Sequence, residues 1–514
     1  MGYRDYRHFL ETLESKGELK RIAEPVSPYL EITEIADRVM KAGGPALLFE
    51  RPEGRGMRLG TPNPMSAVMG QPSIDPEARP SSSVSYAHPV SINALGSERR
   101  MALALGVSDV REHAERIENL LKPELPRGPI EALKTFGRLI SELKGVPPKR
   151  VNDAASQELV EVGDKVDLTK LPVLTCWPED GGPFITLPLV FTHDPQTGKR
   201  NVGMYRIQVY DEKSAGMHWQ MHKVGADHMR TAGEMGRRIE VAVALGGDPA
   251  LTFSAIAPLP PMIDEMLFAG FLRREGVPLV QAKTVDIRVP ADAEFVIEGY
   301  VDPSETRLEG PFGDHTGYYS LAGQFPVLHV TAITKREKAI YPATIVGVPP
   351  MEDGWMGKAV ERIFLPLVRV TVPEIVDMNL PVDACFHNVA FVSIKKKYPG
   401  HAYKVMNAIW GLGQLMFTKF IFVFDEDCNV QDVGEVLFRI GANCDPGRDV
   451  LMTRGPVDQL DHAAQVEGFG GKIGFDCTHK WPAENGFRRD YPKLIRMAPD
   501  VVKKVDDLWP KLGL

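Results

Sequence analysis

The chain has 514 residues, 43% of them hydrophobic and 25% charged, and its formal net charge is -8. That length exceeds what one hydrophobic core usually holds, so we expect two or three domains. The acidic balance argues against a nucleic-acid-binding surface, because phosphate binding needs a basic excess. The five cysteines lie far apart, and no apolar run is long enough to cross a bilayer. We therefore expect a cytoplasmic protein without a disulfide framework.

Residues 1–147 are predicted to form an N-terminal α/β domain that ends near Pro147. Apolar residues from Ile32 to Met40 recur at helical spacing, and two glycines then end the helix. Periodicity disappears from 51 to 90, where prolines and serines predict a long loop. The other expected elements are a strand at 46–50 and helices at 98–105, 109–121 and 130–143.

Residues 148–337 are predicted to be mainly β. β-Branched and aromatic residues gather in runs between turn signals, and HDPQTGK at 193–199 is typical of a hairpin turn. A barrel or a strongly curved sheet would bury so many consecutive strands. The expected strands are 187–192, 202–210, 240–244, 279–289, 295–301 and 327–335, with helices at 227–237 and 263–273.

Residues 338–490 alternate strand and helix signals, which predicts a C-terminal α/β domain with some parallel pairing. In residues 491–514, apolar side chains follow one helical face from Val501 to Trp509, with Asp500 as the expected N-cap. Such an amphipathic terminal helix can dock on its own subunit or on a partner's. The expected elements before it are strands at 389–394 and 420–424 and helices at 403–412 and 430–440.

The segment EGPFGDHTGYY at 309–319 is the most informative for chemistry. Its glycines and proline fix a bent backbone that can aim Glu309 and Asp314 at one point. Repulsion and desolvation there can raise one carboxyl pKa for acid work. The alternative is a turn with two solvated acids, and the residues alone favour neither.

Two further positions could bind a metal. His218 and His222 have the i, i+4 spacing that can turn two imidazoles to one helical face, although HWQMH lacks the glutamate of zinc proteases. One histidine with oxygen ligands is equally possible. Glu265 begins an otherwise apolar helix, where a buried carboxylate would need a cation, or else it faces water and favours the helix dipole. The absence of GxGxxG, P-loop and GxSxG motifs counts against a common dinucleotide fold, a P-loop protein and an α/β-hydrolase.

Several motifs stand in order along nearly the whole chain. They are EITEIADR at 31–38, AGGPALLFE at 42–50, CWPEDGG at 176–182, NVGMYR at 201–206, EGPFGDHTGYY at 309–319, KKKYPGHAYKVM at 395–406, MFTKF at 416–420 and THKWP at 478–482. Together they resemble the UbiD family of reversible decarboxylases, which use prenylated flavin mononucleotide (FMN). Within the family the chain is most similar to the bacterial 4-hydroxy-3-polyprenylbenzoate decarboxylases of quinone biosynthesis. The loop at 51–90 is longer than in those enzymes, which leaves the substrate open.

The resemblance implies a fold and a set of site residues. The fold is α+β, with an N-terminal α/β domain, a central split β-barrel similar to flavin reductases, and a C-terminal α/β domain with a terminal helix. The implied catalytic group is Arg206, Glu309 and Asp314, and the implied metal ligands are Asn201, His222 and Glu265, which suit Mn²⁺ or Mg²⁺. Many members hold K⁺ beside that metal. The residues implied to line the cofactor are Met204, Tyr205, Arg206, His218, Trp219, Gln220, Lys223 and Val224.

The implied reaction is non-oxidative decarboxylation of an aromatic acid of the 4-hydroxybenzoate type, with or without a polyprenyl tail. The cofactor serves as electron sink, Asp314 delivers a proton, and Arg206 paired with Glu309 holds the carboxylate. The implied partners are a flavin prenyltransferase that supplies the cofactor and further copies of the chain, as a dimer or hexamer. A lipid substrate would bring the enzyme to a membrane surface. The alternatives are a (de)carboxylase of another hydroxyarene or naphthoate acid, a subunit of a larger carboxylase, and a simple flavin oxidoreductase.

Overall fold

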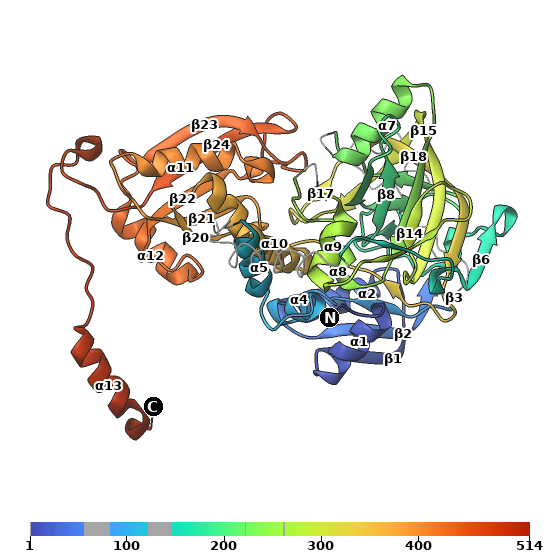
Figure 1. Cartoon of the computed structure of the whole chain (residues 1–514), viewed down its shortest axis with the longest axis horizontal. Helices are drawn as coiled ribbons and strands as arrows, with labels where there is room; N and C mark the ends of the chain where they lie inside the picture. Colours follow the sequence, from blue (N-terminus) through green and yellow to red (C-terminus); the bar gives the residue numbers. More distant parts are fainter. Residues whose placement is uncertain (1, 56–82, 122–145, 222, 261–262, 514) are drawn as a thin grey trace, which may run out of the picture.

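The computed structural model describes residues 2–55, 83–121, 146–221, 223–260 and 263–513. An N-terminal sheet and a large curled sheet pack together on one side of the molecule, and a smaller C-terminal sheet lies on the other (Figure 1). The long helix α10 (Glu352–Thr371) lies between the two sides. The predicted α+β class is confirmed.

The N-terminal part is a mixed sheet covered by helices. Its elements are α1 (Tyr6–Ser15), β1 (Leu19–Val26), α2 (Glu31–Lys41), β2 (Ala46–Arg55), β3 (Ser83–Ser85), β4 (Val90–Ile92), α4 (Glu98–Ala104) and α5 (Arg111–Leu121). Helix α2 forms as its periodicity predicts, with Ile32, Ala36 and Met40 buried along one face. Strand β2 runs parallel to β1 and antiparallel to β4.

The predicted loop from 51 to 90 is only partly right. Strand β2 continues to Arg55, and β3 pairs with that far end of β2 in an antiparallel hairpin. The sequence predicted a strand that ends at residue 50, because Pro52 and Gly54 in the second half of β2 are residues that strands usually lack. Residues 56–82 and the predicted helix at 130–143 lie outside the described part of the chain.

The central part is built on a nine-stranded sheet in which all neighbours run antiparallel. Its order is β7–β10–β11–β18–β15–β12–β8–β9, with β6 also paired to β18. Irregular register between Glu298 and Gly299 and between Val301 and Thr306 bends β15 and curls the sheet. The strands are β6 (Leu159–Val162), β7 (Phe184–Ile185), β8 (Leu189–His193), β9 (Arg200–Met204), β10 (Ile207–Val209), β11 (Ser214–Met217), β12 (Ile239–Leu245), β15 (Phe295–Glu309) and β18 (Gly323–Lys335).

The predicted strongly curved sheet is therefore confirmed, and the similarity to flavin reductases stays a prediction. The hairpin predicted at 193–199 joins β8 to β9. Two predicted strands are each divided. The run 202–210 breaks into β9 and β10, and the run 279–289 breaks into β13 (Pro278–Gln281) and β14 (Arg288–Pro290).

Both faces of the curled sheet are buried. In β12, Val241 and Val243 point into one hydrophobic core, whereas Ala242 and Ala244 point into another, as the two-residue period of a strand requires. Helices α8 (Pro249–Ser254) and α9 (Glu265–Arg273) and the three-stranded sheet β14–β13–β5, with β5 at Lys149–Arg150, contribute to these cores. Helix α7 (Val224–Glu234) follows β11.

After β18 the chain returns to the N-terminal sheet before it continues. Strand β19 (Tyr341–Pro342) pairs parallel with β4 and extends that sheet. The first residue of α10, Glu352, is buried, and its carboxylate accepts hydrogen bonds from the backbone N–H of Leu95 (2.7 Å) and of Asn93 (3.2 Å). The start of α10 is thereby fixed to the N-terminal part.

The C-terminal part is a five-stranded sheet with order β20–β21–β22–β24–β23. Strands β21, β22 and β24 run parallel, which confirms the predicted parallel pairing. Its elements are β20 (Ile375–Asn379), β21 (Val389–Ile394), α11 (His401–Trp410), β22 (Phe420–Asp425), α12 (Val433–Asn443), β23 (Val450–Pro456) and β24 (Phe469–Asp476).

The last helix, α13 (Pro499–Leu512), stands away from the rest of the molecule (Figure 1). It contains no buried residue, so its apolar face from Val501 to Trp509 is exposed. The expected N-cap is wrong, because Ala498 occupies that position and Asp500 lies within the first turn, where Pro499 already supplies the helical φ angle. Within the described part of the chain, no helix has the length and apolar character needed to span a membrane.

Candidate active site

Arg206, Glu309 and Asp314 meet inside the curled sheet. Arg206 lies in the short break between β9 and β10, Glu309 ends β15, and Asp314 follows the two-residue strand β16 (Phe312–Gly313). Arg206 Nε and Nη2 donate to the two carboxylate oxygens of Glu309 at 2.7 and 3.1 Å, and Nη1 donates to Asp314 Oδ2. The three side chains are 8%, 0% and 8% exposed, respectively. The structure thus brings the predicted catalytic group together around one guanidinium.

The guanidinium decides the charge state of both carboxyls. Burial by itself raises a carboxyl pKa, but Arg206 and His218 outweigh it and lower the pKa of Glu309 to about 2. Arg206 and the hydrogen bond from His315 likewise hold the pKa of Asp314 well below its ordinary value, against the effect of burial. The expectation that one of the two pKa values is raised is wrong, because Arg206 lies between the carboxylates and replaces their repulsion by two attractions.

His218 supports Glu309 from the other side. Its Nδ1 lies 3.1 Å from Glu309 Oε2, and its ring packs 4.3 Å from that of Phe325. His218 directly follows strand β11, and the nearest helix, α7, begins only at Val224. The hypothesis that His218 and His222 share a helical face is therefore wrong for His218. His222 lies outside the described residues.

The loop that carries Asp314 is held by buried polar side chains. Asp180 Oδ1 accepts from the backbone N–H of Gly313 (2.8 Å), and Gln208 Oε1 accepts from that of Gly310 (2.8 Å). A Cβ on Gly313 would lie 2.1 Å from Cδ1 of Trp177, so only glycine fits there. Because each anchor satisfies a buried backbone group, the loop has one conformation in which Asp314 reaches Arg206. Sequence reasoning missed Asp180 and Gln208, although Asp180 lies in the motif CWPEDGG.

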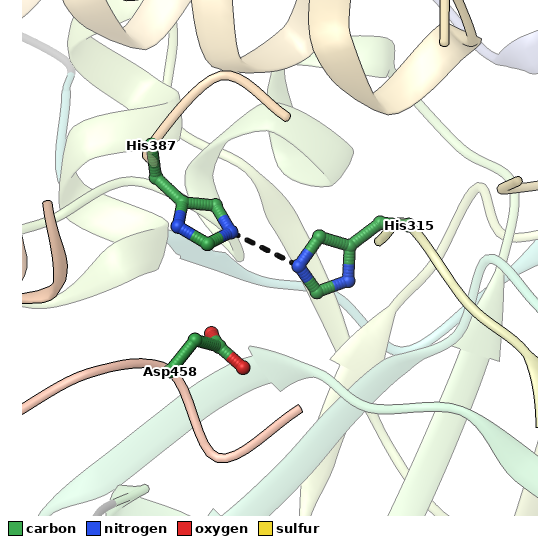
Figure 2. A group of neighbouring side chains, drawn as sticks. All are labelled: His315, His387 and Asp458. Atoms are coloured by element: carbon green, nitrogen blue, oxygen red, sulfur yellow. Dashed lines mark hydrogen bonds between the residues drawn. The ribbon is translucent and has the colours of Figure 1, made fainter. Parts of the chain in front are cut away.

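A second cluster adjoins Asp314 and was also missed from the sequence. His315 Nδ1 lies 2.9 Å from Asp314 Oδ1, and His315 Nε2 lies 3.0 Å from His387 Nε2. Figure 2 shows the two rings facing each other with the carboxylate of Asp458 beside them. His387 precedes β21 and Asp458 follows β23, so both come from the C-terminal part. The only available signal was the position of His315 directly after Asp314.

Two of the three predicted metal ligands lie beside each other. Asn201 is in β9, Glu265 begins α9, and the backbone N–H of Val202 donates to Glu265 Oε2 at 3.3 Å. Burial raises the pKa of Glu265 to about 7. A divalent cation would supply the missing positive charge, and amide and carboxylate oxygens are ligands that Mg²⁺ and Mn²⁺ accept.

The predicted cofactor residues lie between the end of β9 and the start of α7. Met204 ends β9 and Tyr205 follows it, whereas Trp219 and Gln220 are buried between β11 and α7. Trp219 Nε1 and His218 Nε2 are buried and have no hydrogen-bond partner within the described ranges, so a polar ligand fits against them. Lys223 is the N-cap of α7 and Val224 its first residue, and a helix N-terminus of this kind binds phosphate. Burial lowers the pKa of Lys223.

Comparison with known proteins covers the whole chain. The chain matches three domains of 3-octaprenyl-4-hydroxybenzoate carboxy-lyase: the N-terminal domain over residues 10–72, the Rift-related domain over 149–349 and the C-terminal domain over 354–477. An uncharacterized protein of Archaeoglobus fulgidus is 48% identical over 514 residues, which is 100% of this chain and 99% of that protein.

Solved structures of two enzymes are similar to this chain over nearly its whole length. HmfF of Pelotomaculum thermopropionicum, a UbiD-class enzyme in an evolved dimeric form with prenylated FMN, is 28% identical with a TM-score of 0.74, covering 98% of this chain and 100% of that one. Vanillic acid decarboxylase of Sedimentibacter hydroxybenzoicus in its closed form is 25% identical with a TM-score of 0.80 over 100% of both chains. Its open form gives a TM-score of 0.75, over 100% of this chain and 99% of that chain.

The matched domains define a carboxy-lyase, and the curled nine-stranded sheet, a half-barrel, carries the buried arginine–carboxylate group. The chain belongs to the UbiD family.

We predict that Arg206→Gln reverses the pH dependence of stability at this site. In the wild type both carboxyl pKa values are lowered, so their contribution is present above the unfolded-state values near pH 4 and is lost as pH falls through the folded-state values. Without the guanidinium, burial raises both folded-state pKa values, so the variant gains stability as pH falls. Loss of about 3 kcal/mol or more is expected at pH 8, and a smaller loss at pH 5.

The measurement is the denaturation midpoint of both proteins between pH 5 and 8. Arg238→Gln is the matched control, because Arg238 and Asp302 form a solvent-accessible pair whose loss should change the midpoint little at either pH. A deficit for Arg206→Gln that is equal at pH 5 and pH 8 would contradict the assigned charges.

Proposed function

We propose that this chain is a prenylated-FMN-dependent decarboxylase that removes carbon dioxide from an aromatic acid without net oxidation. The observation that carries this proposal is the buried group of Arg206, Glu309 and Asp314. One guanidinium and two ionised carboxylates meet in this group, and His218, one of the residues proposed to hold the cofactor, contacts Glu309. The bound prenylated FMN of HmfF supports the cofactor assignment, and vanillic acid decarboxylase supports an aromatic substrate.

The residues of the chain have separate tasks in this proposal. The residues that would hold prenylated FMN are Met204, Tyr205, Arg206, His218, Trp219, Gln220, Lys223 and Val224. Those that would hold Mn²⁺ or Mg²⁺ are Asn201, His222 and Glu265. Prenylated FMN, when bound, supplies the electron sink for loss of carbon dioxide. Arg206 orients the substrate carboxylate with Glu309 as its counter-charge, and Asp314 gives a proton to the carbon that loses the carboxylate.

The proposed substrate is an acid of the 4-hydroxybenzoate type, in quinone biosynthesis where it carries a polyprenyl tail. The match to 3-octaprenyl-4-hydroxybenzoate carboxy-lyase supports this choice. A small hydroxyarene acid is the second candidate, which the likeness to vanillic acid decarboxylase favours. In either case we place the enzyme in the cytoplasm, with a flavin prenyltransferase as supplier of the cofactor. A polyprenyl substrate would bring it to the membrane surface.

We predict that activity depends on both the cofactor and Asp314. Protein made without a flavin prenyltransferase should be inactive and should gain activity on reconstitution, measured as product formed from 4-hydroxybenzoate, 3-prenyl-4-hydroxybenzoate and vanillate. Reconstituted Asp314→Asn should bind the flavin and lose turnover by roughly a hundred- to ten-thousand-fold, because an amide does not supply the proton. Full activity of cofactor-free protein would refute the proposal, and the preferred acid in the panel separates the two substrate candidates.

A second prediction concerns the metal. Glu265→Ala should lose bound Mn²⁺ and with it most of the flavin, because the ion that Glu265 would hold supplies positive charge for the cofactor's phosphate. Elemental analysis and flavin absorbance of the purified proteins measure both. Asp264→Ala is a demanding control. Asp264 is the neighbouring carboxylate, but it pairs with Arg200 and caps α9, so its loss should weaken the helix and leave the metal in place. Unchanged metal content in Glu265→Ala would show that the ligand assignment is wrong.

We also propose that the chain forms a homo-oligomer, a dimer or a hexamer, and that α13 contributes to the contact. An exposed apolar helix that leaves its own subunit is stabilised when it packs on another surface. HmfF is described in a dimeric form, which supports self-association.

Removal of residues 491–514 should therefore lower the molar mass in solution, as measured by light scattering. The double substitution Val505→Ser with Leu508→Ser should do the same through the apolar face, whereas Lys504→Ser should not. A full-length chain that is already monomeric at micromolar concentration would end this proposal.

A further inference from the structure

The proposed reaction needs a proton that Asp314 alone does not supply. Decarboxylation converts R–COO⁻ and one H⁺ into R–H and CO₂, so each turnover consumes one proton. Arg206 and His315 hold Asp314 ionised, and a carboxylate has no proton to give. The site is buried, so this proton must reach Asp314 through a neighbouring group.

His315 is that neighbour. Its Nδ1 lies 2.9 Å from Asp314 Oδ1, and its backbone N–H donates to the same oxygen at 2.8 Å, which holds that carboxylate oxygen beside the ring. Its Nε2 lies 3.0 Å from Nε2 of His387 (Figure 2). Both ring nitrogens are therefore in use, one toward the acid and one toward the C-terminal part.

We propose that His315 stores the proton that Asp314 delivers, and that His387 holds His315 in position for this transfer. His315 acts through Asp314, so it is a positioning and proton-supplying residue. The inference rests on the proposed function. In the step, the Nδ1–H bond of the His315 imidazolium breaks and an O–H bond forms on Asp314. Asp314 passes the proton to the substrate carbon, and neutral His315 recovers its proton from water between turnovers.

The surrounding charges decide which imidazole carries the proton. Burial opposes charge on His315, but Asp314, Asp458 and Asp353 face it and raise its pKa to about 9. His387 is half-buried next to that charge and faces Lys419 and Lys223 as well as Asp458, and its pKa is lowered to about 4. At neutral pH His315 is therefore the cation, and His387 is the neutral acceptor of its Nε2–H.

The contact joins two parts of the molecule. His315 belongs to the loop after β16, whereas His387 and Asp458 belong to the C-terminal part. Vanillic acid decarboxylase is known in open and closed forms, and this chain has the higher TM-score with the closed one. The bond between the two histidines would form on closure, so that Asp314 is supplied while the substrate is enclosed and His315 meets water on opening.

The test uses holoenzyme reconstituted with prenylated FMN and two assays on each variant. Net decarboxylation requires the proton, whereas exchange of ¹³C-labelled carbon dioxide into the carboxylate of the substrate does not. In His315→Gln, net turnover should fall about a hundred-fold, while label exchange stays within a few-fold of wild type. The wild-type kcat should decline above about pH 9 as the imidazolium is lost, and this limb should be absent in His315→Gln.

The second position and a control complete the design. His387→Leu removes the acceptor of the His315 Nε2–H bond. The decline of kcat at alkaline pH should then begin at a lower pH, and kcat itself should fall several-fold. His387→Gln keeps an acceptor oxygen, so its kcat and its pH profile should be close to those of the wild type. His329→Gln is the control, because His329 forms a comparable 2.6 Å bond to Glu305 elsewhere in the sheet and should leave both assays unchanged.

Three outcomes would overturn the inference. Turnover and exchange that fall together in His315→Gln would indicate only a structural role. A net turnover of His315→Gln within three-fold of the wild-type value would show that His315 has no role in supplying the proton. The side chains of His315, His387 and Asp458 could also bind a divalent cation together. A second equivalent of Zn²⁺ or Mn²⁺ that is bound by the wild type and lost in His387→Gln would therefore show a metal site instead. Wild-type holoenzyme without either activity would refute the proposed function itself, which is a distinguishable result.

Discussion

The position of Arg206 between two buried carboxylates is the constraint on which the rest of the site depends. A guanidinium with almost no contact with water is stable only with anionic partners, and each carboxylate is stable only with the guanidinium. The three residues come from the break between β9 and β10, the end of β15 and the loop after β16. Their mutual dependence therefore fixes the relative positions of three segments of the curled sheet, and the half-barrel provides the rigid frame that keeps them there.

The curled sheet also explains why the loop that carries Asp314 has a fixed conformation. Asp180 and Gln208 satisfy backbone groups at both ends of the Gly310–Gly313 segment, and Trp177 fills the space that a side chain at Gly313 would need. The flanking residues thus act on Asp314 through the backbone alone. His315 is the exception, since it touches the carboxylate directly and extends its environment across to the C-terminal part.

Local sequence patterns predicted most of the secondary structure, because helices such as α2 and strands such as β21 each bury one continuous apolar pattern. The pairing of Arg206 with Glu309 could be predicted only from the family resemblance, and the charge state of the acids was predicted wrongly. A sequence shows two carboxylates five residues apart, but it does not show that a cation more than a hundred residues away will lie between them. His387 and Asp458 were missed for the same reason. They precede and follow unremarkable strands, and only the packing of the two halves brings them to His315.

The return of the chain to its first sheet has a consequence for biosynthesis. Strand β4 is only three residues long, and its second neighbour, β19, lies about 250 residues further along the chain. When the ribosome has produced the N-terminal sheet, one edge of it still lacks its partner, and Glu352, which binds the loop beside β4, has not yet been synthesised. Contacts that close such long loops form late. The N-terminal part can therefore complete its sheet only after the curled sheet has emerged, and until then this edge presents unpaired backbone N–H and C=O groups.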